Sequence, residues 1–339
     1  MRKIDWRIGW FLLAMAVSIS LYGQSKVGTT AVPFLGISAG TRGTAMGGAY
    51  TGVSDDVSSL YFNPAGISRS MNSQVEFVHV KWLVGTTFSW FGMKLNLDES
   101  NTIGVSVTQL DYGEEPVNTV DQPEGTGEDW SASDLATGLS YARNLTDRFS
   151  IGGTVKYIRQ KIWNEKASAF AVDVGLLFTT QFNDMKLGMS ISNFGTDMKM
   201  DGKDLLHRVD LDPTTVGHNK TIVAKLKTDG WPLPLFFRVG VSMDVLRFSQ
   251  GRLTCAVDAL RPSDNTETIN AGCELSLLES VSLRAGYKSL FREDSEEGLT
   301  LGAGLKVKYS PTTSLCLDYT FADFGLFDYI QMFSMGICF

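Results

Sequence analysis

Three histidines are the residues of this 339-residue chain whose chemistry would be easiest to recognise, because imidazole serves as a general base and as a metal ligand. His79 stands alone, and His207 and His218 share one polar segment without a cysteine or carboxylate spacing that specifies a metal. The carboxylates of Asp55 and Asp56 are adjacent in sequence, so their side chains diverge, and such a pair more often begins a turn or a helix. No phosphate loop of the Gly-x-x-x-x-Gly-Lys-Ser/Thr type is present. We therefore expect no catalytic residue, no metal site, no cofactor and no enzymatic activity.

The cysteines and the net charge narrow the class of protein further. Cys255, Cys273, Cys316 and Cys338 are widely spaced, which predicts neither a disulfide framework nor a Cys-x-x-Cys metal site, although Cys255 and Cys273 could be cross-strand neighbours. The formal net charge is −7. An acidic chain offers no electrostatic attraction for nucleic acid, so none is expected as a partner.

The first 23 residues have the pattern of a signal peptide. Arg2, Lys3 and Arg7 precede an apolar run from Ile8 to Leu21, and small residues follow at plausible cleavage positions before Gln24. The alternative is a membrane anchor, but the run is about 14 residues long and a spanning helix needs ~20. We expect cleavage and export, which changes the net charge from −7 to −9 because three cations and one anion are removed.

The rest of the chain alternates between apolar and small or polar residues, which indicates strands with two different faces. A soluble β-sandwich would also alternate. However, the segments approach the ~9–11 residues of a tilted transmembrane strand, whereas soluble strands average ~5–6. Aromatic residues also gather at segment ends, as the interfacial girdles of a membrane barrel require; they include Trp82, Tyr141, Tyr157, Trp163, Tyr309 and Tyr329.

The lengths of the connections support a transmembrane barrel. Long connections, at about 113–130 and 196–233, follow only the third and seventh predicted strands, whereas the connections after even strands are short. Single-chain outer-membrane barrels have an even number of strands, with short periplasmic turns and long outer loops. We therefore predict an all-β outer-membrane barrel with both termini in the periplasm. Its fourteen strands are expected at 75–82, 86–97, 101–112, 131–144, 149–163, 167–180, 185–195, 234–246, 251–262, 267–278, 281–290, 297–309, 314–323 and 328–339.

If the apolar phase faces lipid, the opposite phase places mixed charges inside the barrel. These lumenal polar residues include Asp173, Arg238, Asp258, Glu274 and Arg284. A barrel of this size is too wide for wall side chains to fill alone and narrower than the porins that hold an aqueous channel. We expect residues 24–73 to form a plug inside a barrel of residues 74–339, with a loose periplasmic arm as the alternative. The plug is expected to use Phe34, Arg42, Gly47, Gly48, Asp55, Asp56, Asn63, Pro64, Ala65 and Gly66.

The last segment alternates through Phe333, Met335 and Ile337 to Phe339. In a closed barrel this strand would pair with the first strand rather than expose an edge. Phe339 resembles the terminal signature by which outer-membrane proteins are handed to their assembly machinery.

The block FLGISAGTRGTAMGGAYTGVSDDVSSLYFNPAG, from Phe34 to Gly66, resembles the N-terminal block of the PorV/PorQ family of the type IX secretion system. The resemblance extends to residues 169–176 and 232–241. It implies a FadL-like barrel without enzymatic activity. PorV-like members bind the C-terminal domains of secreted cargo and pass the cargo to a cell-surface attachment complex, whereas PorQ-like members anchor partner proteins at the outer surface.

The resemblance also implies where partners bind. Cargo, attachment proteins or translocon components would meet the acidic Glu114–Asp129 loop and the mixed Thr196–Trp231 loop, while lipid surrounds the wall. The alternative function is a channel for hydrophobic small molecules, because FadL-type transporters carry a similar Asn-Pro-Ala-Gly element in their hatch. A polar, charged lumen would disfavour that alternative.

Overall fold

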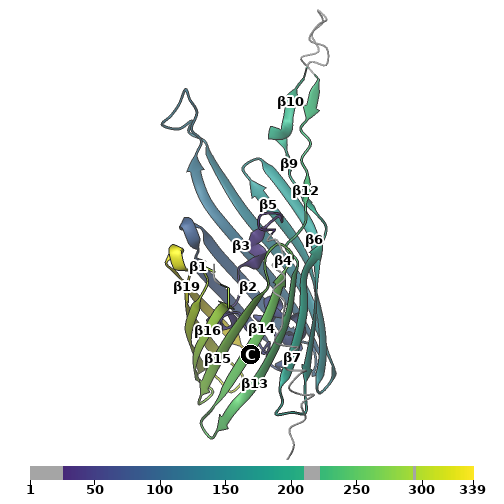
Figure 1. Cartoon of the computed structure of the whole chain (residues 1–339), viewed down its shortest axis with the longest axis vertical. Helices are drawn as coiled ribbons and strands as arrows, with labels where there is room; N and C mark the ends of the chain where they lie inside the picture. The colour runs from purple at the N-terminus through teal and green to yellow at the C-terminus, as the bar shows by residue number, and fades with distance from the viewer. Residues whose placement is uncertain (1–25, 210–221, 293–294) are drawn as a thin grey trace, which may run out of the picture.

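A computed structural model describes residues 26–209, 222–292 and 295–339 (Figure 1). The predicted signal peptide, residues 1–23, lies outside the described residues, as does His218. Within the described ranges, no helix is long and apolar enough to cross a membrane.

Fourteen antiparallel strands form a closed barrel, because β1 pairs with both β2 and the last strand, β19. The same sheet also contains β9 (Asp201–Gly202), which pairs only with the start of β6. The predicted number of strands is confirmed. The barrel strands are β1 (Gln74–Lys81), β2 (Thr87–Asn96), β3 (Asn101–Pro116), β4 (Asp129–Thr146), β5 (Phe149–Ile162), β6 (Glu165–Thr179), β7 (Lys186–Gly195), β13 (Phe236–Phe248), β14 (Gly251–Pro262), β15 (Thr268–Leu277), β16 (Val281–Leu290), β17 (Leu299–Lys308), β18 (Ser314–Asp323) and β19 (Tyr329–Cys338).

Alternation along each strand separates an outer apolar face from an inner face. On β6, Phe170 and Val174 are exposed on the outside, whereas Asp173 between them is fully buried inside. β19 alternates in the same way, with Phe333, Met335 and Ile337 outside. Such an apolar exterior is stable only against lipid, because water would have to hydrate every outward Phe, Val and Leu.

The connections sort by length as the sequence predicts, which defines two ends of the barrel. At the short-turn end, strands are joined by turns such as 147–148 and 249–250. At the long-loop end, β3 and β4 continue their pairing as far as Pro116 and Asp129, so much of the predicted 113–130 loop is an extended β-hairpin. The register shifts between Asp111 and Glu114 where this hairpin leaves the wall.

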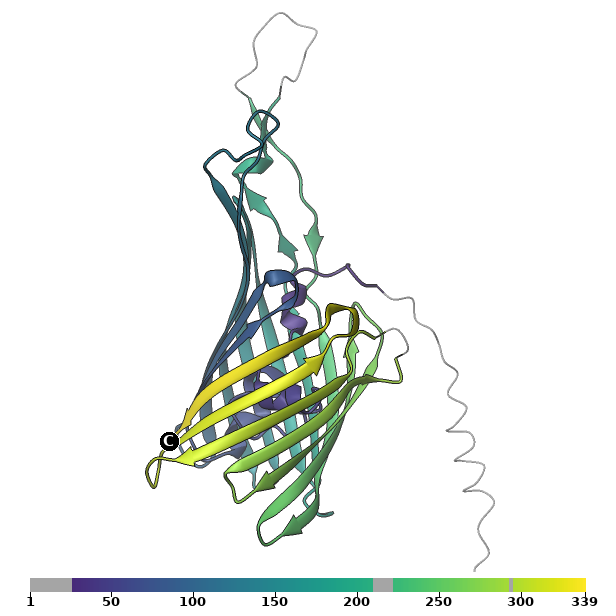
Figure 2. The ribbon, with the colours of Figure 1, turned by 90° about the vertical axis from the view of Figure 1, so that its left-hand side faces the viewer.

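A second projection at the long-loop end is formed by the connection between β7 and β13 (Figure 2). It contains β8 (Met198–Lys199), β9, the short helix η4 (Lys203–Leu205), β10 (Leu206–Arg208), β11 (Val223–Lys225) and β12 (Gly230–Trp231). β8 pairs with β12, and β10 pairs with β11. Both projections rise beyond the rest of the barrel in Figure 1.

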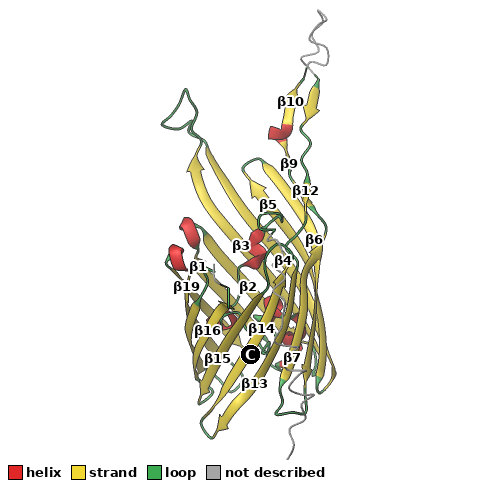
Figure 3. Ribbon diagram, viewed as in Figure 1, coloured by secondary structure: helices red, strands yellow, loops and turns green. Residues whose placement is uncertain are grey.

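The helices are short and most lie before β1 (Figure 3). Residues 26–73, here called the N-terminal segment, contain η1 (Pro33–Gly36), α2 (Thr41–Ala45), α3 (Ser59–Phe62) and η2 (Pro64–Arg69). Besides η4, the other helical turns of the described residues are η3 (Leu83–Gly85) and η5 (Gly325–Phe327), which connect strands at the long-loop end.

The inside of the barrel, the lumen, differs between its two ends. Toward the long-loop end it is apolar, with Val80, Phe88, Trp90 and Ile158 buried against Phe34 of the N-terminal segment. Charged side chains are concentrated toward the short-turn end, where β15, β16 and β18 carry Glu274, Arg284 and Asp318. The sequence predicts a polar, charged lumen, and this is wrong for the long-loop half, where the buried cluster is apolar.

Candidate functional site

The N-terminal segment runs the length of the lumen. At the long-loop end, the Ala31 N–H donates to the Pro232 carbonyl at 2.9 Å, and the Thr30 hydroxyl donates to Asp264 at 2.7 Å. At the short-turn end, Arg69 Nη1 donates to the Asp147 carbonyl at 2.6 Å. The segment therefore enters at one mouth of the barrel and leaves at the other before β1 begins.

The sequence analysis predicts that both termini lie on the same side of the barrel, and the path of the N-terminal segment does not agree with this. Phe339 lies at the short-turn end, where its N–H donates to the Ser73 carbonyl at 2.9 Å, but the first described residues lie at the long-loop end. The two ends of the described chain are thus not on the same side. An even number of strands places the start of β1 and the end of β19 at the same end of the barrel. It gives no information about a segment that crosses the lumen before β1.

Glycines on both partners bring the N-terminal segment into backbone contact with the wall. A Cβ on Gly272 of β15 would overlap the Met46 backbone, and one on Gly286 of β16 would overlap Gly47. Gly47 itself has φ +67°, a left-handed conformation that favours glycine. Any side chain larger than hydrogen at the two wall positions would push the segment away from the barrel.

Buried side chains of the barrel wall form hydrogen bonds with backbone N–H and carbonyl groups of the N-terminal segment. Asp258 of β14 accepts hydrogen bonds from the N–H groups of Tyr50 and Thr51 at 2.9 and 2.7 Å. Thr300 and Thr320 donate to the carbonyls of Ala45 and Thr41 at 3.0 and 2.8 Å. Because unpaired buried backbone groups are costly, these bonds fix the segment in one register against the wall.

The Asn-Pro-Ala-Gly element is a turn anchored to the opposite wall. Asn63 accepts a hydrogen bond from Ala65 N–H at 3.2 Å and so caps η2, while Pro64 occupies the first turn, where its missing N–H costs nothing. The Asn63 amide also donates to the Leu176 carbonyl of β6 at 2.9 Å. Gly66 packs so closely on Ser54 that no Cβ fits there.

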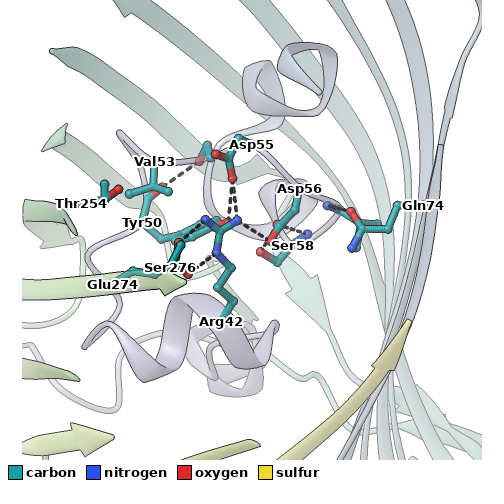
Figure 4. A network of polar contacts seen from close by, with 12 residues as sticks. Arg42, Tyr50, Val53, Asp55, Asp56, Ser58, Gln74, Thr254, Glu274 and Ser276 are labelled. Atoms are coloured by element: carbon teal, nitrogen blue, oxygen red, sulfur yellow. Dashed lines mark hydrogen bonds and ion pairs between the residues drawn. The ribbon is translucent and has the colours of Figure 1, made fainter. Parts of the chain in front are cut away.

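A charged cluster links the N-terminal segment to β15 at the short-turn end (Figure 4). Arg42 forms ion pairs with Asp55 at 2.6 Å and Asp56 at 3.1 Å, and donates two parallel bonds of 2.7 Å to Glu274. Glu274 also accepts from Arg284, which contacts Asp318 of β18. We call Arg42, Asp55, Asp56, Glu274 and Arg284 the lumen charge cluster.

The positive charges around Asp55 in the lumen charge cluster lower the pKa of its carboxyl group. Burial alone would raise the pKa of Asp55, but the charges of Arg42 and Lys186 outweigh it and the pKa is lowered. The carboxylate is therefore ionised at neutral pH, and the opposite charges hold the segment on the wall.

The space around the segment is uneven. At the short-turn end a cavity of about 910 Å³ is lined by the lumen charge cluster and by residues of the turns. In the apolar half, the space between Phe34, Leu60 and Trp90 amounts to only about 20 Å³, which is one water molecule at most. The described residues thus form a vestibule open toward the short-turn end and filled toward the long-loop end.

The remaining predicted lumenal residues also face inward. Asp173 is paired with Lys156 at 2.6 Å and accepts from the N–H of Asn193, where β7 has a bulge. Arg238 of β13 donates to Ser192 at 3.2 Å and lies over the Tyr61 ring of the segment at 5.2 Å. Arg238 on β13 and Asp173 on β6 lie two and four strands away from Glu274 on β15.

The two projections carry different charge. Between residues 111 and 134, the β3–β4 hairpin has no Lys, Arg or His, and its acidic residues are Asp111, Glu114, Glu115, Asp121, Glu124, Glu128, Asp129 and Asp134. The projection between β7 and β13 mixes both signs, with an ion pair between Lys225 and Asp201. In the described residues, no three His, Cys, Asp or Glu side chains are grouped as they would be to hold a metal ion.

Comparison with known proteins adds two findings. The family model described as "Type IX secretion system protein PorV" matches residues 21–211. No curated protein sequence matches the chain.

Among solved structures, the chain is similar to the monoaromatic hydrocarbon channel CymD, with a TM-score of 0.54 and 11% identity over 89% of this chain and 97% of that one. It is also similar to the toluene transporter TodX of Pseudomonas putida, with a TM-score of 0.51 and 12% identity, and to TbuX of Ralstonia pickettii, with 0.51 and 11%. Both comparisons cover 89% of this chain and 97% of the other. At these identities the likeness extends to the barrel fold alone.

Proposed function

The chain belongs to the PorV family of type IX secretion system proteins, and from this we propose that it binds secreted cargo or surface partner proteins at the outer membrane and performs no catalysis. The family match carries the proposal. In this role the barrel is a membrane-held platform, and the chemistry that matters is recognition at its loops.

The filled lumen supports binding over passage. The N-terminal segment acts as a plug, because glycine contacts, hydrogen bonds to its backbone and the lumen charge cluster hold it on several strands. The pocket between Phe34, Leu60 and Trp90 holds only about 20 Å³, which is too little for a polypeptide to pass on that side of the segment. Partners must therefore be met outside the lumen.

The acidic β3–β4 hairpin is the proposed contact surface. It extends beyond the wall, is exposed along its tip and carries only negative charge, so it favours a partner with a basic patch. We place this long-loop end at the cell surface and the short-turn end in the periplasm. Protease cleavage within 117–128 on intact cells would support this orientation, and cleavage only after the outer membrane is opened would reverse it.

Co-purification tests the function. A tagged barrel isolated from its own outer membrane should retain secreted proteins that share a C-terminal sorting domain, or translocon components. Replacing Glu124 and Glu128 by Gln should reduce recovery several-fold at low salt, while Glu99→Gln with Glu279→Gln, exposed at the short-turn end, should not. If the unaltered barrel recovers neither class of protein, the proposed function is wrong; equal recovery by all three proteins would reject only the hairpin.

A channel for hydrophobic small molecules is the second candidate. The apolar long-loop half of the lumen, with Phe88 and Trp90, and the likeness to hydrocarbon channels favour it. It requires the N-terminal segment to move, since the pocket of about 20 Å³ between Phe34, Leu60 and Trp90 admits no such ligand. Uptake of labelled hydrocarbons or fatty acids in a deletion strain tests it, and unchanged uptake would reject it.

Phe339 is proposed to be an assembly signal. Its backbone bonds to Ser73 at the seam between the first and last strands, and its ring is half exposed on the outer face. Phe339→Ala should lower the amount of heat-modifiable barrel in the membrane, while Phe333→Ala, which removes an outward ring on the same strand, should lower it less. An equal loss in both variants would assign the effect to lipid-facing area.

A further inference from the structure

Two thiols inside the barrel lie in contact. Cys316 of β18 and Cys338 of β19 have Sγ atoms 3.4 Å apart, and both line the 910 Å³ cavity at the short-turn end. In the register of these strands Cys316 lies opposite Gly336, and Cys338 lies opposite Ser314. The cysteines are therefore diagonal neighbours, and the absence of a side chain on Gly336 leaves room for the sulfurs to meet.

The other two cysteines provide a comparison within the same chain. Cys255 of β14 and Cys273 of β15 are directly opposite each other and form a disulfide. Their neighbours Val257 and Leu253 show that this pair lies on the outer, lipid-facing side. The bonded pair faces lipid, whereas Cys316 and Cys338 face an aqueous cavity that soluble oxidants can enter.

We propose that Cys316 and Cys338 are a second site of thiol oxidation, where a disulfide joins β18 to β19. The inference does not depend on the partner-binding role. An outer-membrane protein matures in an oxidising compartment, where such bonds persist. To form the bond, the sulfurs would approach by about 1.4 Å, from 3.4 Å to the ~2.05 Å of a disulfide.

The oxidant is a disulfide, either of a thiol–disulfide oxidoreductase or of a small molecule that enters the cavity. One thiolate attacks a sulfur of that disulfide, forms a mixed disulfide and releases one thiol of the oxidant. The second thiolate then attacks the mixed disulfide and releases the other thiol. Two electrons and two protons leave the cysteines, and the oxidant is reduced to two thiols.

The bond would fix the end of the strand that closes the barrel. β19 pairs with β18 on one side and β1 on the other, and Cys338 is the last residue of β19. A covalent link at this position prevents β18 and β19 from separating at the short-turn end, next to the charges of Lys306 and Asp318.

Thiol trapping on the natural protein tests the proposal without any variant. Membranes are prepared without reductant, denatured in N-ethylmaleimide, digested and measured by mass spectrometry. The expected result is a peptide pair joined through Cys316 and Cys338 in most molecules. Alkylation of both thiols in most molecules, or a link from either thiol to Cys255 or Cys273, would overturn the proposal.

The variant Cys316→Ser tests whether the proposed disulfide stabilises the barrel. Cys316→Ser should leave Cys338 alkylated and should lower the unfolding temperature in a heat-modifiability gel without reductant. With reductant, the variant and the natural protein should unfold within about a degree of each other. A difference that persists in reductant would show a packing effect instead of a lost bond.

Discussion

Replacing Arg42 by Met should detach part of the N-terminal segment from the wall while keeping an apolar side chain of similar reach. The substitution removes the cation that joins Asp55 and Asp56 to Glu274. Breaking a buried ion pair by removing one partner costs ~3–5 kcal/mol. Lys186 lies 3.8 Å from Asp55 and Arg284 still pairs with Glu274, so the lower end, about 3 kcal/mol, applies here.

Hydrogen exchange of the backbone amides measures this loss of stability within the N-terminal segment itself. A loss of about 3 kcal/mol raises the open population, and with it the exchange rate, by roughly 100-fold. The relevant amides are those of Gly48 and Ser54, which donate to Gly43 and Tyr50 within the segment. Mass spectrometry of peptides covering residues 41–56, in detergent, should show the acceleration while peptides of β5 and β6 remain unchanged.

A matched control uses an exposed arginine at the same mouth. Arg247→Met breaks ion pairs with Asp184 and Asp244, but its side chain is 59% exposed and screened by solvent, so little stability should be lost. Exchange in residues 41–56 should then change by less than about fivefold. If Arg42→Met also leaves exchange within this range, the charges do not hold the segment, and the glycine and backbone contacts suffice.

Three further outcomes follow from the same contacts. Asp258→Ala leaves two buried N–H groups unpaired and should destabilise the barrel by about 2–4 kcal/mol in thermal unfolding, while Asp258→Asn keeps an acceptor and should lose less than half of that. Gly272→Ala should displace Met46 and speed exchange in the segment, whereas Gly153→Ala, with 3.4 Å to its nearest neighbour, should not. The lowered pKa of Asp55 adds stability that is fully present above the ordinary value of ~3.9 and is lost below the lowered value. The unfolding temperature of the natural protein should therefore exceed that of Asp55→Asn by a constant amount from pH 8 to 5, and this difference should shrink below pH 4; a difference that does not change with pH would show that ionisation of Asp55 does not contribute.

The strands were predictable because lipid imposes one rule. Most outward residues at the depth of the lipid must be apolar, so alternation reveals each strand, as β6 shows with Phe170 and Val174 outside and Asp173 inside. The connections after even-numbered strands are short and the long ones follow odd-numbered strands, and this difference identifies the two ends of the barrel. Pairing beyond the wall was not predictable in this way, because the β3–β4 hairpin near Glu114 is exposed on both faces and has no apolar phase.

The interior was harder to predict, since its pairings are set by three-dimensional proximity. Glu274 lies 232 residues from Arg42, and nothing in spacing links them. The apolar half was also missed, although the sequence has short apolar runs that depart from strict alternation, Phe77-Val78 on β1 and Trp90-Phe91 on β2. Those runs were the available signal that this part of the wall is apolar on both faces.

Enclosure of the N-terminal segment has a consequence for the order of assembly. The seam that closes the barrel joins β1 to β19, so it joins the earliest and latest strands of the described chain. The segment touches walls as far apart in sequence as β2, through Lys94, and β18, through Thr320. Once the seam forms, a segment held on so many sides has no lateral way in. We therefore expect the barrel to close around the N-terminal segment, with the segment in place before the last strands pair.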